Sequence, residues 1–174
     1  MRLFVAVRPS TEAADVLDRL PRPVAPRVRW LPRSQWHVTL RFLGDADPGE
    51  AAAALGAVPW GEVAPVDVML GPATALLGGA VVMVPAAGGD DLAARVAMAT
   101  GHVGQLSGGQ PPEDRPFVGH LTLGRFRDEP PPGAIGSPVS ISFRADEVLL
   151  VASRTLPEGA VHEVVARFPL ASEA

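Results

Sequence analysis

Short apolar runs, separated by glycine, proline and acidic residues, divide the chain into expected strands. Runs of four to eight apolar residues, or stretches in which apolar and polar positions alternate, are typical of β-strands. Two glycines between the fourth and fifth runs predict a hairpin turn. The expected strands are residues 2–7, 28–31, 36–44, 66–77, 80–86, 117–126, 139–153 and 160–170.

Three segments carry helical periodicity instead: residues 10–20, 48–58 and 91–106. Ser10 is a suitable N-cap for the first of them. Its apolar stripe, like that of the last segment, repeats at spacings of three and four residues, which is one face of a helix. The stripe residues are Ala13, Leu17 and Leu20 in the first helix, and Leu92, Val96, Ala99, Val103 and Leu106 in the last.

The order of these elements favours an α+β fold. Strands and helices do not alternate strictly, and many connections are short enough for hairpins, so the sheet should be mainly antiparallel. We expect one domain over residues 1–174, with two pseudo-symmetric lobes of sheet and flanking helices around a central cleft.

One tetrad occurs twice. Residues 37–40 read His-Val-Thr-Leu and residues 120–123 read His-Leu-Thr-Leu, 83 positions apart, which is close to half of the 174 residues. Each copy follows a segment that contains an expected helix. This arrangement indicates an internal duplication of one structural unit, with the two halves related by a pseudo-twofold axis.

Strand geometry separates the side chains of each tetrad. Successive side chains point to opposite faces of a sheet. Thr39 therefore shares a face with His37, and Thr122 shares a face with His120. The apolar residues between them anchor each strand to the core, and the two polar faces can meet across one cleft.

The two copies differ immediately after the tetrad. The first reads HVTLRF and the second HLTLGRF, with Gly124 as an extra residue. An additional glycine in a strand indicates a β-bulge. Simple alternation places Arg41 on the face of His37, and a bulge at Gly124 returns Arg125 to the face of His120. We expect Arg41 and Arg125 to contact phosphate.

Two His-x-Thr units suit chemistry at phosphorus. Cleavage of a phosphodiester needs a base to activate the attacking oxygen and an acid to protonate the leaving oxygen. Histidine, with an unperturbed pKa of roughly 6.5, can do either near neutral pH. The threonine hydroxyls can donate hydrogen bonds to the non-bridging oxygens. This scheme uses no metal and no cofactor.

Composition narrows the alternatives. A net charge of −4 argues against a surface that coats nucleic acid, although not against a local positive site. All 15 basic residues are arginine, so lysine nucleophiles and a Walker A lysine are excluded. Without cysteine there are no disulfides or thiolate ligands. No signal peptide or membrane-spanning run is evident, so we expect a cytoplasmic protein, and a monomer.

The chain resembles the 2H phosphoesterase superfamily, which is defined by two His-x-Thr/Ser motifs. The resemblance lies in RLFVAV near the start, WHVTLRFLGD, RPFVGHLTLGRF and FPL near the end. Within the superfamily it is most similar to the RNA 2′,3′-cyclic phosphodiesterases, historically called 2′-5′ RNA ligases. The resemblance implies a bilobal fold, with RNA ends or nucleotides carrying a 2′,3′-cyclic phosphate as substrates.

The same resemblance implies roles for the tetrads. His37 corresponds to the proton donor and His120 to the proton acceptor, and Thr39 and Thr122 correspond to phosphate-binding hydroxyls. The family often has tyrosine in the last strand, whereas this chain has no tyrosine and carries His162 there. That departure affects substrate contacts from the last strand and not the two motifs.

Other candidate residues have simpler explanations. His102 and His162 are expected at the surface, and the alternative for His162 is a position lining the cleft. Trp30 and Trp36 are expected in the core, although either tryptophan, like Phe4 and Phe42, has the chemistry to stack on a base. Arg27, Arg29 and Arg33 form either a solvated loop or a rim that attracts RNA ends. Three alternative functions stay open: 2′-5′ ligation of RNA ends, nucleotide binding without catalysis, and a two-histidine metal site.

Overall fold

The computed structural model describes residues 1–104, 116–157 and 159–172. Its helices are α1 (Thr11–Asp18), α2 (Pro48–Gly56) and α3 (Asp90–Thr100), and short 3-10 helices span Arg33–Gln35 and Trp60–Glu62. Its strands are β1 (Arg2–Val7), β2 (Val28–Trp30), β3 (Val38–Asp45), β4 (Val66–Leu70), β5 (Ala75–Leu77), β6 (Val81–Ala87), β7 (His120–Phe126), β8 (Ile141–Ala145), β9 (Glu147–Leu156) and β10 (Gly159–Pro169).

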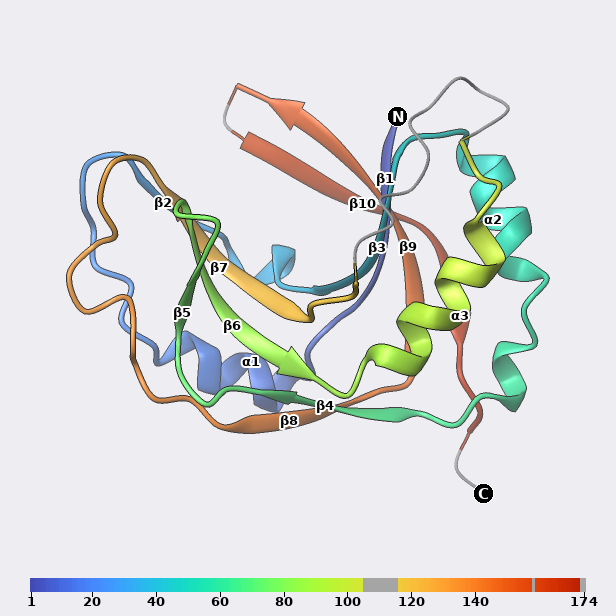
Figure 1. Cartoon of the computed structure of the whole chain (residues 1–174), viewed down its shortest axis with the longest axis horizontal. Helices are drawn as coiled ribbons and strands as arrows, with labels where there is room; N and C mark the ends of the chain where they lie inside the picture. Colours follow the sequence, from blue (N-terminus) through green and yellow to red (C-terminus); the bar gives the residue numbers. More distant parts are fainter. Residues whose placement is uncertain (105–115, 158, 173–174) are drawn as a thin grey trace.

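The strands form one curled antiparallel sheet with two halves (Figure 1). Its order is β10-β9-β1-β3-β7-β6-β4-β8, and β2 and β5 add to β7 and β6. The two tetrad strands, β3 and β7, are the central neighbours. Four strands of this order lie on each side of their boundary, so each lobe has its tetrad strand at the inner edge. The expected α+β fold with two lobes is confirmed.

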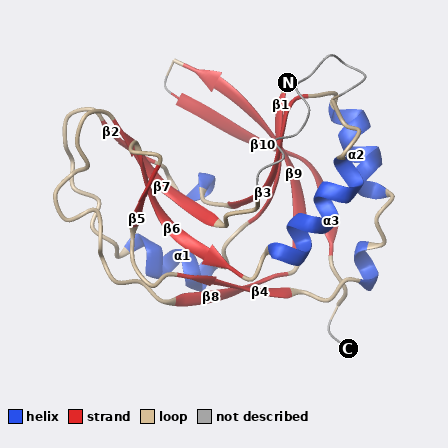
Figure 2. Ribbon diagram, in the orientation of Figure 1, coloured by secondary structure: helices blue, strands red, loops and turns tan. Residues whose placement is uncertain are grey.

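Helices α1 and α3 each pack against the lobe that does not contain the strand preceding them. Helix α1 follows β1 of the first lobe but packs against β8 of the second. Helix α3 follows β6 of the second lobe but packs against β3 of the first, and α2 lies beside α3 (Figure 2). Because each lobe is covered by a helix from the other half of the chain, the two halves share one core.

The first expected helix is confirmed in detail. The Ser10 hydroxyl accepts a hydrogen bond from the amide of Ala13 at 3.1 Å, as an N-cap should. Ala13 and Leu17 of the predicted stripe are buried in α1; the helix ends at Asp18, earlier than expected, and Leu20 is buried just beyond it. The third helix is shorter than expected: it ends at Thr100, turns occupy residues 101–104, and the remaining predicted residue, Leu106, lies outside the described residues.

Two expected strands are each divided. Residues 66–77 form β4 and β5, separated at Gly71, whose φ of +138° strongly favours glycine. Residues 139–153 form β8 and the start of β9, separated at Asp146, so that one part joins the second lobe and the other the first. The predicted glycine turn joins β5 to β6, with positive φ at both Gly78 and Gly79.

Apolar residues pack on both faces of the first lobe. The main core includes Leu3, Val5 and Val7 of β1 together with residues from all three named helices. The opposite face carries a small separate cluster of Phe4, Ala6, Leu149 and Val151. His37 lies beside this small cluster. We call the side of the sheet that carries Phe4, Ala6 and His37 the cleft face.

Candidate active site

The two tetrads meet at one antiparallel residue pair. Val38 lies opposite Leu121, and this is the one β3–β7 pair in the described part of the chain. Both side chains are buried in the core, at 1% and 0% exposure. Continuing the register by one residue in each direction brings His37 beside Thr122 and Thr39 beside His120. All four polar side chains are half-buried on the cleft face.

The two histidine rings are held in the same way. Nδ1 of His37 lies 2.7 Å from the carbonyl oxygen of Gln35, and Nδ1 of His120 lies 3.0 Å from that of Val118. A carbonyl oxygen only accepts hydrogen bonds, so each Nδ1 carries the proton. Each neutral ring then presents an unprotonated Nε2 for proton transfer.

The surroundings of His37 distinguish it from His120. The ring of Phe4 stacks on His37 with 4.7 Å between centroids, and the ring of His162 meets it edge-on at 5.2 Å. His162 also contacts Phe4 at 5.1 Å. The expectation that His162 is an exposed surface residue is wrong, because its strand, β10, pairs with β9 and turns this half-buried side chain toward His37.

Burial lowers the pKa of His37 to about 4. The carbonyl of Gln35 opposes this by stabilising the protonated ring, whereas His162, Arg8 and His120 add smaller lowering effects. His37 is therefore neutral at pH 7 in the protein without substrate. Burial and the charge of Arg8 also lower the pKa of His162.

This burial makes folding stability depend on pH. Below about pH 6.5 the unfolded chain protonates His37, whereas the folded protein does so only near pH 4, so stability is lost as the pH falls between these values. When the pH falls from 7 to 5, we expect the free energy of unfolding of wild type to drop by about 1–2 kcal/mol more than that of His37→Phe, a variant that keeps a ring against Phe4. Urea unfolding at both pH values measures the difference. Equal losses in the two proteins would show that His37 is not buried as a neutral ring.

A bulge follows the first tetrad and moves Arg41. Thr39 lies opposite Ala6, but Arg41 lies opposite Val5, so Leu40 is an extra residue in β3. Val5 belongs to the main core, and paired residues share a face. The expectation from simple alternation, that Arg41 shares the face of His37, is therefore wrong. Arg41 is half-buried on the core side of the sheet.

The second tetrad is followed by an equivalent bulge. Thr122 pairs with Met83 and Gly124 with Val82, so Leu123 is the extra residue. The predicted bulge is confirmed, and Arg125, which pairs with Val81, returns to the face of Thr122 and is exposed. Both tetrads thus carry a bulge at the same position. Gly124 corresponds to Arg41, and Arg125 corresponds to Phe42.

Gly124 is required by close packing. A Cβ atom at this position would lie 2.6 Å from the ring of Trp30 and 3.0 Å from the carbonyl oxygen of Arg29. The neighbouring strand β2 therefore approaches β7 more closely than any side chain at residue 124 allows. The expected packing role of Trp30 is confirmed, and the indole Nε1 donates to the carbonyl of Pro23 at 3.0 Å.

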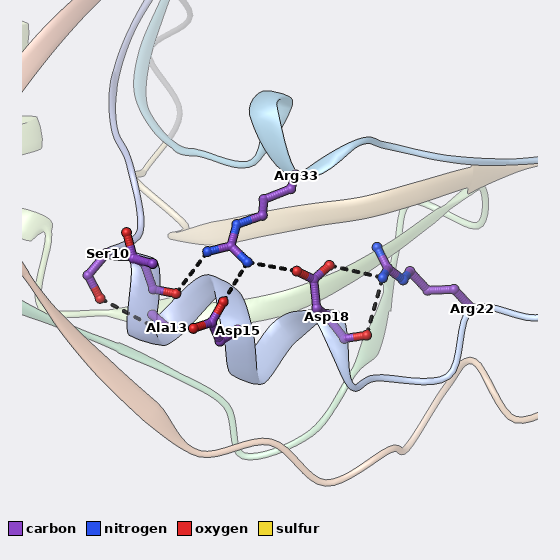
Figure 3. A network of polar contacts seen from close by, with 7 residues as sticks. Ser10, Ala13, Asp15, Asp18, Arg22 and Arg33 are labelled. Atoms are coloured by element: carbon purple, nitrogen blue, oxygen red, sulfur yellow. Dashed lines mark hydrogen bonds and ion pairs between the residues drawn. The ribbon is translucent and has the colours of Figure 1, made fainter.

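The segment before His37 is tied to α1. The Arg33 guanidinium donates to Asp15 at 2.6 Å and to Asp18 at 2.8 Å, and Arg22 donates to Asp18 at 3.0 Å (Figure 3). The hydrogen bond from Arg33 is the main cause of the lowered pKa of Asp18. Arg33 is thus occupied by α1, while Arg27 pairs with Asp128 at 2.6 Å.

Gln35 connects this segment to the last hairpin. Its side-chain Nε2 donates to the carbonyl of Ala160 at 2.6 Å, while its own carbonyl oxygen accepts from His37. Next to it, Trp36 is buried in the core at 1% exposure, as expected. Main-chain and side-chain contacts on both sides therefore hold the first histidine in place.

Features remote from the tetrads do not extend this site. His102 is exposed beyond the end of α3 and lines a groove with α2. Across residues 1–104, 116–157 and 159–172, no group of three histidine, aspartate or glutamate side chains is arranged to hold a metal ion. No helix within these ranges is long and apolar enough to cross a membrane.

The curled sheet is that of the two-histidine phosphoesterases, and the paired His-x-Thr tetrads at its centre carry the motif of that class. The chain belongs to the 2′-5′ RNA ligase superfamily, whose family model matches residues 8–155 and so includes both tetrads. None of the curated protein sequences matches the chain significantly.

Solved structures share the fold over almost the whole chain. TT0787 of Thermus thermophilus is 28% identical over 100% of both chains, with a TM-score of 0.81. E. coli LigT in complex with NADP+ is 23% identical over 98% of both chains, with a TM-score of 0.74. The MHV ns2 PDE domain is 10% identical over 95% of this chain and 99% of its own, with a TM-score of 0.52. The last two similarities show the fold alone.

Proposed function

We propose that this phosphoesterase hydrolyses RNA 2′,3′-cyclic phosphates to 2′-phosphates without a metal ion or cofactor. One observation carries the proposal: two histidines on one face of the sheet each have Nδ1 bound to a backbone carbonyl, which leaves each Nε2 for proton transfer. A nucleotide is a suitable ligand for this fold, since E. coli LigT has been solved with 3′-AMP.

The two tetrads surround one phosphorus atom in this proposal. Thr39 and Thr122 donate hydrogen bonds to the non-bridging oxygens, and Arg125 reaches the phosphate from the same face. His120 removes a proton from the attacking water. The bond from phosphorus to the 3′ oxygen breaks, His37 protonates that oxygen, and the phosphate stays on the 2′ oxygen.

The burial of His37 gives the proposed acid a specific requirement. A neutral ring must gain a proton before it can donate one. A phosphate anion beside Nε2 favours the protonated form and raises the pKa, because opposite charges attract strongly where water is excluded. Substrate binding therefore loads His37 with its proton. Removing the anion returns the ring to the neutral form.

Ligation is the second candidate function. The same residues can catalyse the parallel reaction in which a 5′-hydroxyl replaces water as the nucleophile. His120 removes the proton of that hydroxyl, the bond from phosphorus to the 3′ oxygen breaks, His37 protonates the 3′ oxygen, and a 2′-5′ linkage forms. The match to the 2′-5′ RNA ligase superfamily supports ligation as a candidate function. Water is far more concentrated than RNA ends, so hydrolysis should dominate.

One gel assay separates these activities. An oligonucleotide ending in a 2′,3′-cyclic phosphate is incubated with purified protein, with and without a 5′-hydroxyl oligonucleotide, and with and without EDTA. We expect a 2′-phosphate product in every lane, unaffected by EDTA, and little joined product. An unchanged cyclic phosphate in all lanes would reject the proposal, and binding without turnover would indicate a binding protein. Loss of activity with EDTA would indicate a metal enzyme.

A further inference from the structure

Two basic side chains outside the tetrads lie beside His37 on the cleft face. Val7 pairs with Val38 at the end of β1. Continuing this register by one residue sets Arg8 opposite His37, and paired residues share a face of the sheet. From β10, His162 contacts the ring of His37 edge-on at 5.2 Å, and all three basic residues line one hollow. We call Arg8 and His162 the basic pair.

Neither member of the basic pair is satisfied by the protein itself. Arg8 is half-buried, yet it has no carboxylate partner and no side-chain hydrogen bond among the residues that the structure describes. His162 is also half-buried, and neither of its ring nitrogens forms a hydrogen bond to another described residue. In contrast, His37 uses Nδ1 on a backbone carbonyl. A buried cation without a counter-charge is unfavourable, so the basic pair suits an anion from outside the chain.

The charges that act on this hollow have one sign. Arg8 lowers the pKa of both His37 and His162, and no carboxylate of the described residues is among the groups that shift either pKa. Other arginines of the chain pair with carboxylates: Arg22, Arg27, Arg33, Arg144, Arg154 and Arg167. Arg8 thus differs from them in leaving its charge for a ligand.

The position of the basic pair fits a second phosphate of the same substrate. In the sheet, β1 lies on the side of β3 that is opposite β7 (Figure 1). A phosphate held between the two tetrads lies over β3 and β7. Arg8 is therefore about one and a half strand spacings from it, or roughly 7 Å. One ribose separates successive phosphates of RNA by a similar distance.

We propose that Arg8 and His162 bind the phosphate on the 5′ side of the terminal nucleotide; this rests on the proposed function. The guanidinium supplies the charge and two parallel N–H donors, and the imidazole adds one N–H donor. The substrate class is thereby narrowed to 2′,3′-cyclic phosphates with a second phosphate one nucleotide unit away, as in RNA ends and 5′-phosphorylated nucleotides. A nucleoside cyclic phosphate with a free 5′-hydroxyl is a poorer substrate.

Substrates that differ in the second phosphate test the basic pair through catalysis. Adenosine 2′,3′-cyclic phosphate is compared with its 5′-phosphorylated form and with the dinucleotide ApA that ends in the same cyclic phosphate. A hydrogen bond from a charged group contributes roughly 10-fold to 100-fold in affinity. Wild type should favour the 5′-phosphorylated form by about that factor in kcat/KM, mainly through KM. An equal preference for the dinucleotide would identify a phosphodiester as a ligand too, and its absence would restrict the ligand to a terminal phosphate.

Two variants should reduce this preference. Arg8→Gln should remove most of it, and His162→Phe, which keeps a ring against Phe4 and His37, should lower it about 3-fold to 10-fold. The ratio of kcat/KM between substrates is the readout, because an effect of either variant on His37 itself changes all substrates alike. Arg95→Gln is the matched control, since it removes the same charge from an exposed position on α3 and should keep the wild-type ratio.

A binding measurement separates this proposal from the proposed hydrolysis. Calorimetry with 3′-AMP and with adenosine 3′,5′-bisphosphate needs no turnover, so it tests the basic pair even if the hydrolysis is wrong. Wild type should bind the bisphosphate more tightly, and Arg8→Gln should weaken it roughly 10-fold to 100-fold while weakening 3′-AMP far less. Equal losses for the two ligands, or equal binding of both by wild type, would overturn the proposal.

Discussion

Replacing His120 by alanine should lower the rate of cyclic-phosphate hydrolysis roughly 10²–10⁴-fold, the usual contribution of a positioned acid or base. His37→Ala should cost a similar factor. In the proposed scheme Nε2 of each ring transfers a proton, and no other side chain is assigned that role. The rate of wild type should be bell-shaped against pH, with limbs that belong to the coupled pair.

The double variant distinguishes catalysis from general damage. The effects of replacing two groups that act together in one step are not additive, so the double variant should be only slightly slower than either single variant. His102→Ala is the matched control, since that histidine is exposed beyond α3, and it should have wild-type activity. Circular dichroism and melting temperature verify folding. A His120→Ala protein with near wild-type turnover would reject the assignment.

Gly119→Ala should reduce activity about 10²-fold although it changes no polar side chain. A Cβ atom on Gly119 would lie 2.3 Å from the carbonyl oxygen of Ala86, a distance that real structures do not tolerate. The carbonyl of Gly119 also accepts the amide hydrogen of Ala86 at 2.9 Å. The start of β7 must therefore move away from β6, and His120 moves with it. A displacement of about 1 Å is enough to cost this factor.

Steady-state kinetics with the oligonucleotide substrate measure this effect, and urea unfolding should show a loss of about 1–3 kcal/mol from the forced packing. Gly61→Ala is the control, because a Cβ atom there would have nothing within 4 Å. It should match wild type in rate and stability. If Gly119→Ala also has the wild-type rate, the position of His120 does not depend on the close contact between β6 and β7.

Alternation along the strands was enough to predict the centre of the site. Val38 and Leu121 are buried, whereas the His and Thr residues on either side of them point to the other face of the sheet. The reason is that side chains alternate along a strand and only one face of this sheet covers the main core. The bulge after the second tetrad was also predictable, since Gly124 marks it. The α+β class followed from the order of elements.

The equivalent bulge after the first tetrad has no such signal. It contains Leu40 and Arg41, and neither residue type marks an extra position in a strand. Strict alternation of side chains along β3 therefore placed Arg41 on the wrong face of the sheet. A bulge depends on how many residues the partner strand supplies, which is a property of the pairing and not of one segment.

The amino-acid sequence by itself determined which residues form the two tetrads, their division into polar and apolar faces, and the residue types available for acid–base chemistry. The tertiary structure alone decided that Phe4 and His162 enclose the ring of His37. These contacts join residues from β1, β3 and β10, far apart in the chain. Burial of a histidine, and with it the pKa, depends on everything packed around the ring, so local sequence cannot specify it.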